Sequence, residues 1–148
     1  MSDARPTVNF YPLSATEPDA HLVFACRLAE KALGLGHHIH FHLDSGEQSR
    51  EMDALLWQFR PSAFIPHARL DDPETTVLTG IRVSLGHGEL MPANPDLLIN
   101  LATQVFSRHG EFQRISDIVP ALQPGLDQGR RRYRCSQDQG SSLETYRI

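Results

Sequence analysis

The stretch that decides the fold is residues 22–43, which read LVFACRLAEKALGLGHHIHFHL. Apolar side chains recur at helical spacing through its first half, at Leu22, Cys26, Ala29 and Leu33. Gly34 and Gly36 end that pattern, and residues 38–43 then alternate between polar and apolar as a strand does. The stretch therefore predicts a helix followed directly by a strand.

Strands and helices alternate on both sides of this stretch. Upstream, residues 8–11 form a short apolar run typical of a strand. Downstream, Ser45 and Gln48 have the spacing of a capping box before a helix that carries Met52, Leu55, Leu56 and Phe59. Further strands are predicted at residues 64–65, 77–85, 97–101 and 112–119, with loops at 71–74 and 86–96 and a last helix at 126–135, which Gly129 weakens. We predict one α/β domain over residues 1–148, a three-layer α/β/α sandwich with a mostly parallel sheet.

Length and composition narrow the class of protein. The chain has 148 residues, enough for one domain around one core. Its apolar runs are a few residues long, against the roughly 20 that a membrane-spanning helix needs, and its start lacks the apolar segment of a signal peptide. Cys26 and Cys135 are far apart and lack metal-ligand spacing, which favours free thiols. We expect a cytoplasmic protein with no membrane segment.

The histidines of the predicted strand are a candidate metal site. His38, His40 and His42 would share one face, where imidazoles can coordinate zinc or copper. A metal site would need a further carboxylate or thiolate, and the sequence identifies none. We therefore favour an edge strand with a solvent-exposed polar face, and we expect no metal. Three acidic residues around a proline are interpreted in the same way, as solvated surface: Asp71, Asp72 and Glu74.

Motifs for nucleotide binding and catalysis are missing. The segments at residues 34–36 and 86–88 each have two glycines but lack the third glycine of the dinucleotide fingerprint. A Walker loop, a G-x-S-x-G elbow and an H-E-x-x-H pair are also absent from the sequence. An α/β sheet without a phosphate loop or an activated nucleophile is typical of an interaction module.

An aromatic segment offers a first interaction surface. Residues 56–67 read LWQFRPSAFIPH, with three aromatics and two prolines in a dozen residues. Trp57 and Phe59 lie about 200° apart on a helix, so they do not both face one core. One aromatic side chain of the group should therefore reach the surface, where aromatics are frequent anchors for partner proteins.

A basic cluster near the end of the chain offers a second surface. The chain has a net charge of −4, yet from Arg130 onward it carries five basic and two acidic residues. The cluster consists of Arg130, Arg131, Arg132 and Arg134 around Tyr133. On a helix Arg130 and Arg134 share a face with Tyr133 beside them. Cations and an aromatic side chain can therefore line one groove. A groove of this kind suits a carboxylate next to an apolar side chain, and equally a phosphate next to a base.

Taken together, an ordered set of segments resembles the chi subunit of bacterial DNA polymerase III holoenzyme. The matching pieces are Phe10-Tyr11-x-Leu13, Leu56-Trp57, Phe64-Ile65-Pro66-His67, Leu98-Ile99-x-Leu101, Asp117-Ile118-Val119-Pro120 and Arg130-x-Arg132-Tyr133-Arg134. They follow the order and spacing of the family and cover nearly the whole chain. None is decisive alone, but the ordered set is specific.

The resemblance implies a non-catalytic accessory subunit of the clamp-loader assembly, without a cofactor. Its fold would resemble nucleotide-binding, Rossmann-like domains but lack a functional phosphate loop. Chi subunits pair with the psi subunit and bind the acidic C-terminal tail of single-stranded DNA-binding protein, so contact with DNA would be indirect. By the resemblance, the psi interface would include Trp57, Phe64, Pro66 and His67. The tail would be bound by Val119, Arg130, Arg132, Tyr133 and Arg134.

Two other functions compete with this one. The arginine cluster could bind single-stranded nucleic acid directly, with Tyr133 stacking on bases, although the net charge of −4 argues against it. A nucleotide-dependent enzyme would have the same fold class, but the missing phosphate loop argues against it. A helicase is a further possible partner of the psi-type surface.

Overall fold

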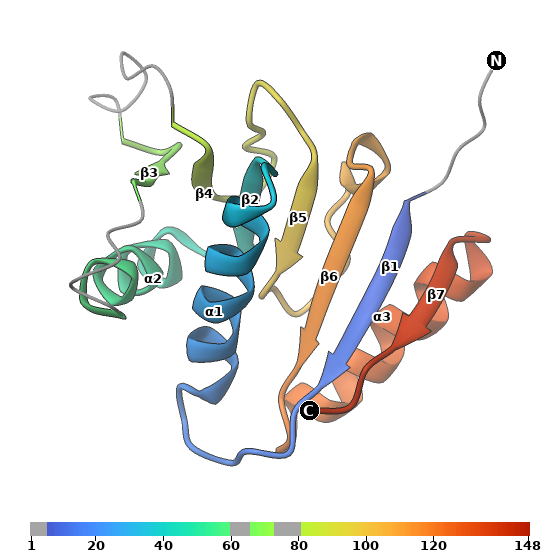
Figure 1. The fold of residues 1–148 in the computed structure, drawn as a ribbon. Coiled ribbons are helices and arrows are strands. Elements are labelled where there is room, and N and C mark those ends of the chain that lie inside the picture. The colour runs from blue at the N-terminus through green and yellow to red at the C-terminus, as the bar shows by residue number, and fades with distance from the viewer. Residues whose placement is uncertain (1–5, 60–65, 73–80) are drawn as a thin grey trace, which may run out of the picture.

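The computed structural model describes residues 6–59, 66–72 and 81–148. The helices described are α1 (Ala20–Gly34), α2 (Gly46–Phe59) and α3 (Gly125–Asp138), and a 3-10 turn lies at His109–Glu111. The strands are β1 (Thr7–Pro12), β2 (Ile39–Leu43), β3 (Ala68–Arg69), β4 (Val83–His87), β5 (Leu97–Asn100), β6 (Arg114–Val119) and β7 (Ser142–Thr145). Figure 1 shows these elements as a single α/β unit.

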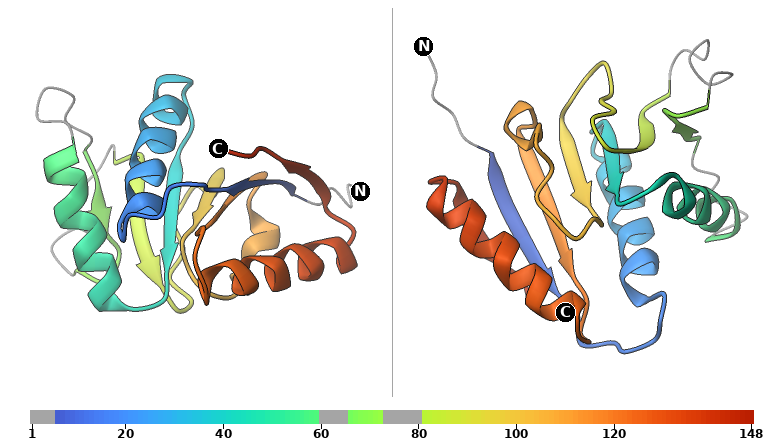
Figure 2. Two further views of the ribbon diagram at one scale, coloured as in Figure 1. Left: turned by 90° about the horizontal axis from the view of Figure 1, so that it is seen from below. Right: turned by 180° about the vertical axis from the view of Figure 1, so that it is seen from behind.

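The strands form one sheet in the order β3-β4-β2-β5-β6-β1-β7. Every pairing in it is parallel. Helices α1 and α2 cover one face of the sheet and α3 covers the other, as the end-on view in Figure 2 shows. The predicted three-layer α/β fold with a parallel sheet is therefore confirmed.

Alternation along the strands fills a separate core on each face of the sheet. On the face of α1 and α2, the largest buried side chains include Ile39, Phe41, Met52, Leu85 and Ile99. On the face of α3, the core consists of Val8, Phe10, Leu98, Phe106, Phe112, Ile115 and Val119. Strands that bury both faces read as continuous apolar runs, and residues 97–99 do so.

The position of the histidine strand shows that the prediction of an exposed edge strand is wrong. Strand β2 lies inside the sheet between β4 and β5 and is not an edge strand, and His40 and His42 are only 1% and 7% exposed. His40 Nδ1 lies 2.7 Å from Ser84 Oγ, and the ring of His42 stacks on Phe106 at 4.1 Å. Burial lowers the pKa of His40 to about 3 and that of His42 to about 4. The pair is a neutral part of the core, because segments after β4 and β5 cover this face.

Capping side chains and glycines mark the ends of two helices. At the start of α2, the Gln48 N–H donates to Ser45 Oγ at 3.2 Å, and the Asp44 N–H donates to Gln48 Oε1 at 3.0 Å. The first bond is the one that a capping box predicts, whereas the Gln48 side chain accepts from the residue before Ser45 and not from Ser45 itself. Helix α1 ends at Gly34, and Gly36 follows with a φ of 92°, a conformation that glycine adopts without strain.

The short strands at both edges are the elements that the sequence missed. Strand β3 has two residues, and β7 is largely exposed, so neither has a clear apolar pattern. Strand β4 begins at Val83, inside the predicted 77–85, and continues to His87. The predicted strand at 64–65 and the start of the 77–85 run lie outside the described residues. None of the helices in the described ranges combines the length and apolar character that crossing a bilayer requires.

Candidate functional site

Helix α3 packs against the sheet through a glycine. Gly129 lies on Val119 of β6, and a Cβ at position 129 would collide with both methyl groups of that valine. The glycine that lowers the helix propensity of this segment therefore permits the close approach of helix and strand. Val119 is consequently only 6% exposed. The approach fixes which residues of α3 face the sheet and which face solvent.

Arg132 turns inward from α3 and binds Asp117 on β6. Its Nε donates to Asp117 Oδ2 at 2.9 Å, its Nη2 donates to Asp117 Oδ1 at 2.9 Å, and its Nη1 donates to the Thr103 carbonyl at 3.0 Å. Both residues are 4% exposed. Burial raises the pKa of the Asp117 carboxyl, and the Arg132 guanidinium opposes that rise. This fork-shaped ion pair joins α3 to the sheet.

Three arginines of the cluster remain on the surface: Arg130, Arg131 and Arg134. We call this set the arginine face. At 100° per residue, its members occupy an arc of about 100° on the side of α3 away from the sheet. Arg130 Nη1 lies 3.3 Å from Asp127 Oδ1, an exposed contact that neutralises little of its charge. Within the described ranges, Arg131 and Arg134 make no ion pair.

Tyr133 occupies the border between this face and the core. Its ring packs on Phe10 with 4.8 Å between centroids and is partly buried. The structure thus separates the five residues that the resemblance assigns to tail binding. Arg130 and Arg134 are exposed, Tyr133 is half-buried, and Val119 and Arg132 are interior.

A groove of about 450 Å³ runs beside the arginine face, between α3 and the segment after β5. It is lined by Thr103, Gln104, Val105, Gln128, Arg131, Arg132 and Cys135. We call it the α3 groove. Sequence reasoning placed Arg131 in the cluster but not at a site. Helical spacing places residues 128, 131, 132 and 135 on neighbouring turns of α3. The sequence does not indicate that residues 103–105 form the other side of the groove, because only the fold brings that segment next to α3.

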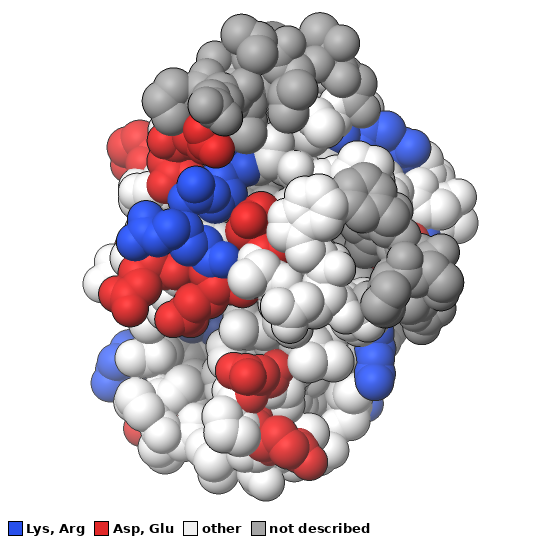
Figure 3. Space-filling view, turned by 90° about the vertical axis from the view of Figure 1, so that its left-hand side faces the viewer, with Lys and Arg blue, Asp and Glu red and all other residues white. Residues whose placement is uncertain are grey.

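The second candidate surface is the exposed end of α2. Trp57 is 53% exposed, and Phe59 is half-buried, so the prediction that one aromatic side chain of the group in residues 56–67 reaches the surface is confirmed. The His67 ring is buried beside Trp57 with 5.0 Å between centroids, and its Nε2 lies 2.9 Å from Asp53 Oδ1. Pro66 is exposed, and Phe64 lies outside the described residues. Figure 3 shows the side of the molecule that carries α2 and β3, where charges of both signs gather.

The edge of the sheet where open α/β folds bind nucleotides has unsuitable chemistry here. Ligands of such folds lie at the carboxyl ends of the strands, with phosphates on helix N-termini. Helix α1 follows β1 after a segment containing Glu17, Pro18 and Asp19. Its two carboxylates would repel a phosphate at the N-terminus of α1. This agrees with the missing phosphate loop.

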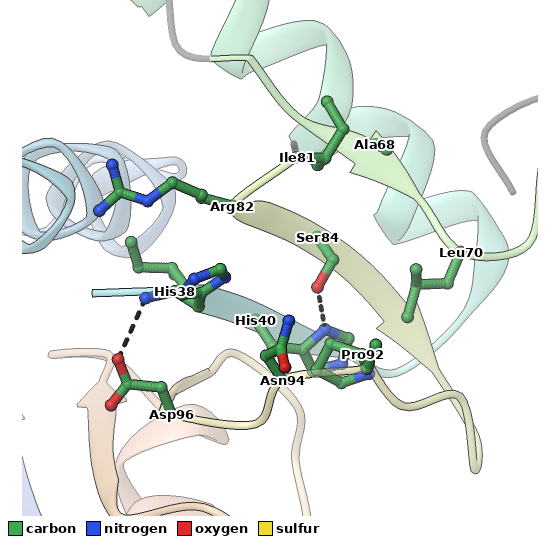
Figure 4. Close-up of a pocket in the computed structure, with 12 residues that line it drawn as sticks. His38, His40, Ala68, Leu70, Ile81, Arg82, Ser84, Pro92, Asn94 and Asp96 are labelled. Carbon is green, nitrogen blue, oxygen red and sulfur yellow. Dashed lines mark hydrogen bonds between the residues drawn. The ribbon is translucent and has the colours of Figure 1, made fainter. Parts of the chain in front are cut away.

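A smaller cavity of about 230 Å³ opens at the opposite edge, where β2 and β4 begin (Figure 4). Its charged groups are already bound within the protein. Arg82 Nη2 donates to the carbonyls of Leu33 and His37 at 3.1 Å, and Asp96 accepts from the His38 N–H at 3.1 Å. Both charged groups are therefore held in place by backbone hydrogen bonds.

Two of the three acidic residues around Pro73 lie beside an arginine. Arg69 lies 3.6 Å from Asp71 and 3.8 Å from Asp72, while Glu74 is outside the described residues. Across the part of the chain that the structure describes, no three histidine, cysteine, aspartate or glutamate residues are arranged to hold a metal ion.

Comparisons with known proteins give a consistent result. A family model described as DNA polymerase III chi subunit, HolC, matches residues 6–144. A protein of Pseudomonas aeruginosa named DNA polymerase III subunit chi is 35% identical over 142 residues, which cover 95% of this chain and 96% of that protein. A protein of the same name from Haemophilus influenzae is 33% identical over 143 residues, or 96% of this chain and 97% of that protein.

A solved structure adds a likeness of fold. The crystal structure of T4 UvsW matches 96% of this chain and 41% of its own chain, with a TM-score of 0.61 and 8% sequence identity. At that identity the likeness concerns the α/β architecture alone.

Proposed function

This chain belongs to the family of DNA polymerase III chi subunits, and from that premise we propose that it is a non-catalytic adaptor in DNA replication. One surface would bind the acidic C-terminal tail of single-stranded DNA-binding protein. The other would bind the psi subunit of the clamp-loader assembly. The protein would then link the polymerase to single-stranded DNA through another protein.

The observation that carries the proposal is the arginine face on an otherwise acidic chain. Arg131 and Arg134 are exposed without an acidic partner in the described ranges, while the whole chain has a net charge of −4. Exposed, unpaired arginines attract carboxylates and hold them by paired hydrogen bonds. An acidic peptide supplies several carboxylates in a row. Its binding should weaken with salt, because the contacts are exposed.

The position of the second surface suits an adaptor. Trp57 lies on α2, and α2 and α3 cover opposite faces of the sheet (Figure 2). Two partners could therefore bind at the same time without competing for space. An exposed tryptophan gives such an interface a large apolar contact area. The lack of a phosphate loop and the acidic segment before α1 support an absence of nucleotide chemistry.

The tail-binding surface is tested with a labelled peptide that ends in the acidic tail sequence. Fluorescence anisotropy should show binding to the wild type and a loss of about tenfold or more for Arg130→Ala/Arg134→Ala. Arg27→Ala is a matched control, because Arg27 is an exposed arginine on α1, across the sheet. Circular dichroism checks that the variants are folded. Equal binding by the double variant and the wild type would refute the assignment.

The second surface is tested by substituting its anchor. Trp57→Ala should weaken binding to a clamp-loader partner by about 2 kcal/mol or more if the indole is a hot spot. Leu35→Ala removes another exposed apolar side chain, at the far end of α1, and should leave binding unchanged. A Trp57→Ala protein that retains full partner affinity would remove this surface from the proposal.

Direct binding of single-stranded DNA is the alternative. The same arginines would attract phosphates, but the ring of Tyr133 is packed on Phe10, which leaves little of it for base stacking. A gel shift of the isolated protein with single-stranded DNA at low salt separates the two functions. The adaptor predicts no shift by the isolated protein, and a further shift of the complex that single-stranded DNA-binding protein itself forms with the DNA.

A further inference from the structure

Helix α1 carries a continuous stripe of side chains on the side away from the sheet. Ala20, Phe24, Arg27 and Lys31 follow one another every three or four residues, which places them along one side of the helix. The side chains that α1 buries against the sheet lie on its opposite side. Figure 2 shows α2 beside α1 and the sheet beneath it, and none of the described helices or strands covers the stripe from outside. We call it the α1 stripe.

Charges of opposite sign mark the two ends of this stripe. Glu17 and Asp19 lie at the start of α1. Arg27 and Lys31 follow about 12 and about 18 Å beyond Asp19 along the helix axis, at a rise of roughly 1.5 Å per residue. All four are exposed, and none of them forms a salt bridge with another residue that the structure describes. Their charges are therefore available to a partner.

An apolar hollow lies along the first half of the stripe. Its volume is about 380 Å³. Val23 and Phe24 line it from α1, and Leu13 and Ile148 add further apolar lining. Ile148 is 51% exposed, so apolar surface at the hollow is open to solvent. Three of the four charged residues named above line the same hollow, so the charges and the apolar surface form one site.

The charge pattern of the stripe is complementary to its own reverse. A peptide that is basic throughout, or acidic throughout, would meet like charge at one end. A second α1 laid antiparallel instead brings the basic end of each helix to the acidic end of the other, while the apolar middles meet. We propose that the α1 stripe binds the α1 stripe of a second copy of this chain across a two-fold axis.

The antiparallel arrangement fixes which residues meet. The axis passes between Val23 and Phe24. Arg27 then lies opposite Ala20 of the second copy and beside its Asp19, because residues 20 and 27 are equally far from the axis. Lys31 reaches the segment of the second copy that precedes its α1, where acidic residue 17 lies. Each of these pairs occurs twice, because a two-fold interface uses the same patch on both copies.

The interface is small and exposed, so we expect a weak dimer with a Kd of about 10–100 µM that dissociates further in salt. Helix α3 lies on the opposite face of the sheet, so the arginine face of each copy stays accessible in the dimer. Two tail-binding surfaces would then be joined in one particle, which strengthens binding to an assembly that carries several tails. The dimer itself does not depend on tail binding.

Analytical ultracentrifugation of the full chain from about 1 to about 300 µM tests the proposal. The weight-average mass of the wild type should rise from that of one chain toward that of two. Arg27→Glu and Asp19→Arg each bring like charges together at both ends of the interface, so each should weaken association by about tenfold or more. An equal mixture of these two variants restores both pairs and should associate as the wild type does. Asp138→Arg is the matched control, because Asp138 is an exposed acid on α3, across the sheet.

The variants should fold, because the Asp19 side chain makes no capping hydrogen bond and Arg27 has no salt bridge to lose in the described ranges; circular dichroism checks this. A wild type that stays monomeric at about 300 µM would overturn the proposal. A dimer that survives Arg27→Glu would show that another surface associates, and a mixture that fails to associate would exclude the antiparallel pairing. Binding of a single labelled tail peptide should be the same in all these variants, so failure of the dimer and failure of tail binding are distinguishable.

Discussion

Replacing Arg132 by alanine should destabilise the fold far more than any other arginine substitution in the cluster. The change removes three hydrogen bonds to Asp117, at 2.9, 2.9 and 3.1 Å, and those to the carbonyls of Thr103 at 3.0 Å and Ile118 at 3.4 Å. It also leaves a carboxyl group of 4% exposure without its counter-ion. Removing one partner of such a pair costs about 3–5 kcal/mol, because the remaining charge stays buried. That is a large part of the roughly 5–15 kcal/mol by which a domain is stable.

Urea unfolding followed by circular dichroism measures this cost. The midpoint should fall in Arg132→Ala, with the slope unchanged. Arg134→Ala removes an exposed arginine from the same helix and should change the unfolding free energy by less than about 0.5 kcal/mol. Replacing the pair together, as Arg132→Met with Asp117→Leu, should recover most of the loss. The reasoning is wrong if Arg132→Ala is as stable as Arg134→Ala.

Three further perturbations test other parts of the structure. Gly129→Ala should lower the free energy of unfolding by about 1–2 kcal/mol, because overpacking against Val119 exceeds the gain in helix propensity. Gly34→Ala is the control and should be neutral or stabilising, because its added Cβ meets nothing within 4 Å. Equal melting temperatures of the two variants would contradict this. The pKa values of His40 and His42 fall from 6.5 to about 3 and about 4 on folding, so the unfolded chain binds more protons. Stability should be full above pH 6.5 and decrease below it by up to about 1.4 kcal/mol per pH unit for each histidine, and a flat profile in urea titrations between pH 7 and 4.5 would count against their burial. Trp57 is the single tryptophan and is 53% exposed, so acrylamide should quench its fluorescence and a bound clamp-loader partner should protect it; unprotected fluorescence in the complex would exclude it from the interface.

The sequence predicted those elements whose local pattern agrees with their packing. Helix α1 and strand β2 follow from helical spacing, two glycines and a clear alternation. The histidines show the limit of that reasoning. Alternation identified which residues share a face, but it did not reveal that segments distant in sequence cover this face, so His40 and His42 were predicted to be exposed and are buried.

The site was only partly predictable for the same reason. Helical spacing placed Arg130 and Arg134 together on one face of α3. The inward turn of Arg132 depends on Asp117, which lies on a different element, and no spacing within α3 indicates it. Gly129 lowers helix propensity and so weakened the prediction of α3, yet its contact with Val119 explains why it is tolerated.

The most direct test of the adaptor is a reconstitution on beads that carry the acidic tail peptide of single-stranded DNA-binding protein. Clamp-loader subunits including psi are added with or without the chi-family protein, and the amount of clamp loader retained on the beads is quantified. The account predicts retention only when the protein is present, and loss of retention with Arg130→Ala/Arg134→Ala and with Trp57→Ala. Retention in the absence of the chi-family protein, or wild-type retention with either variant, would contradict it.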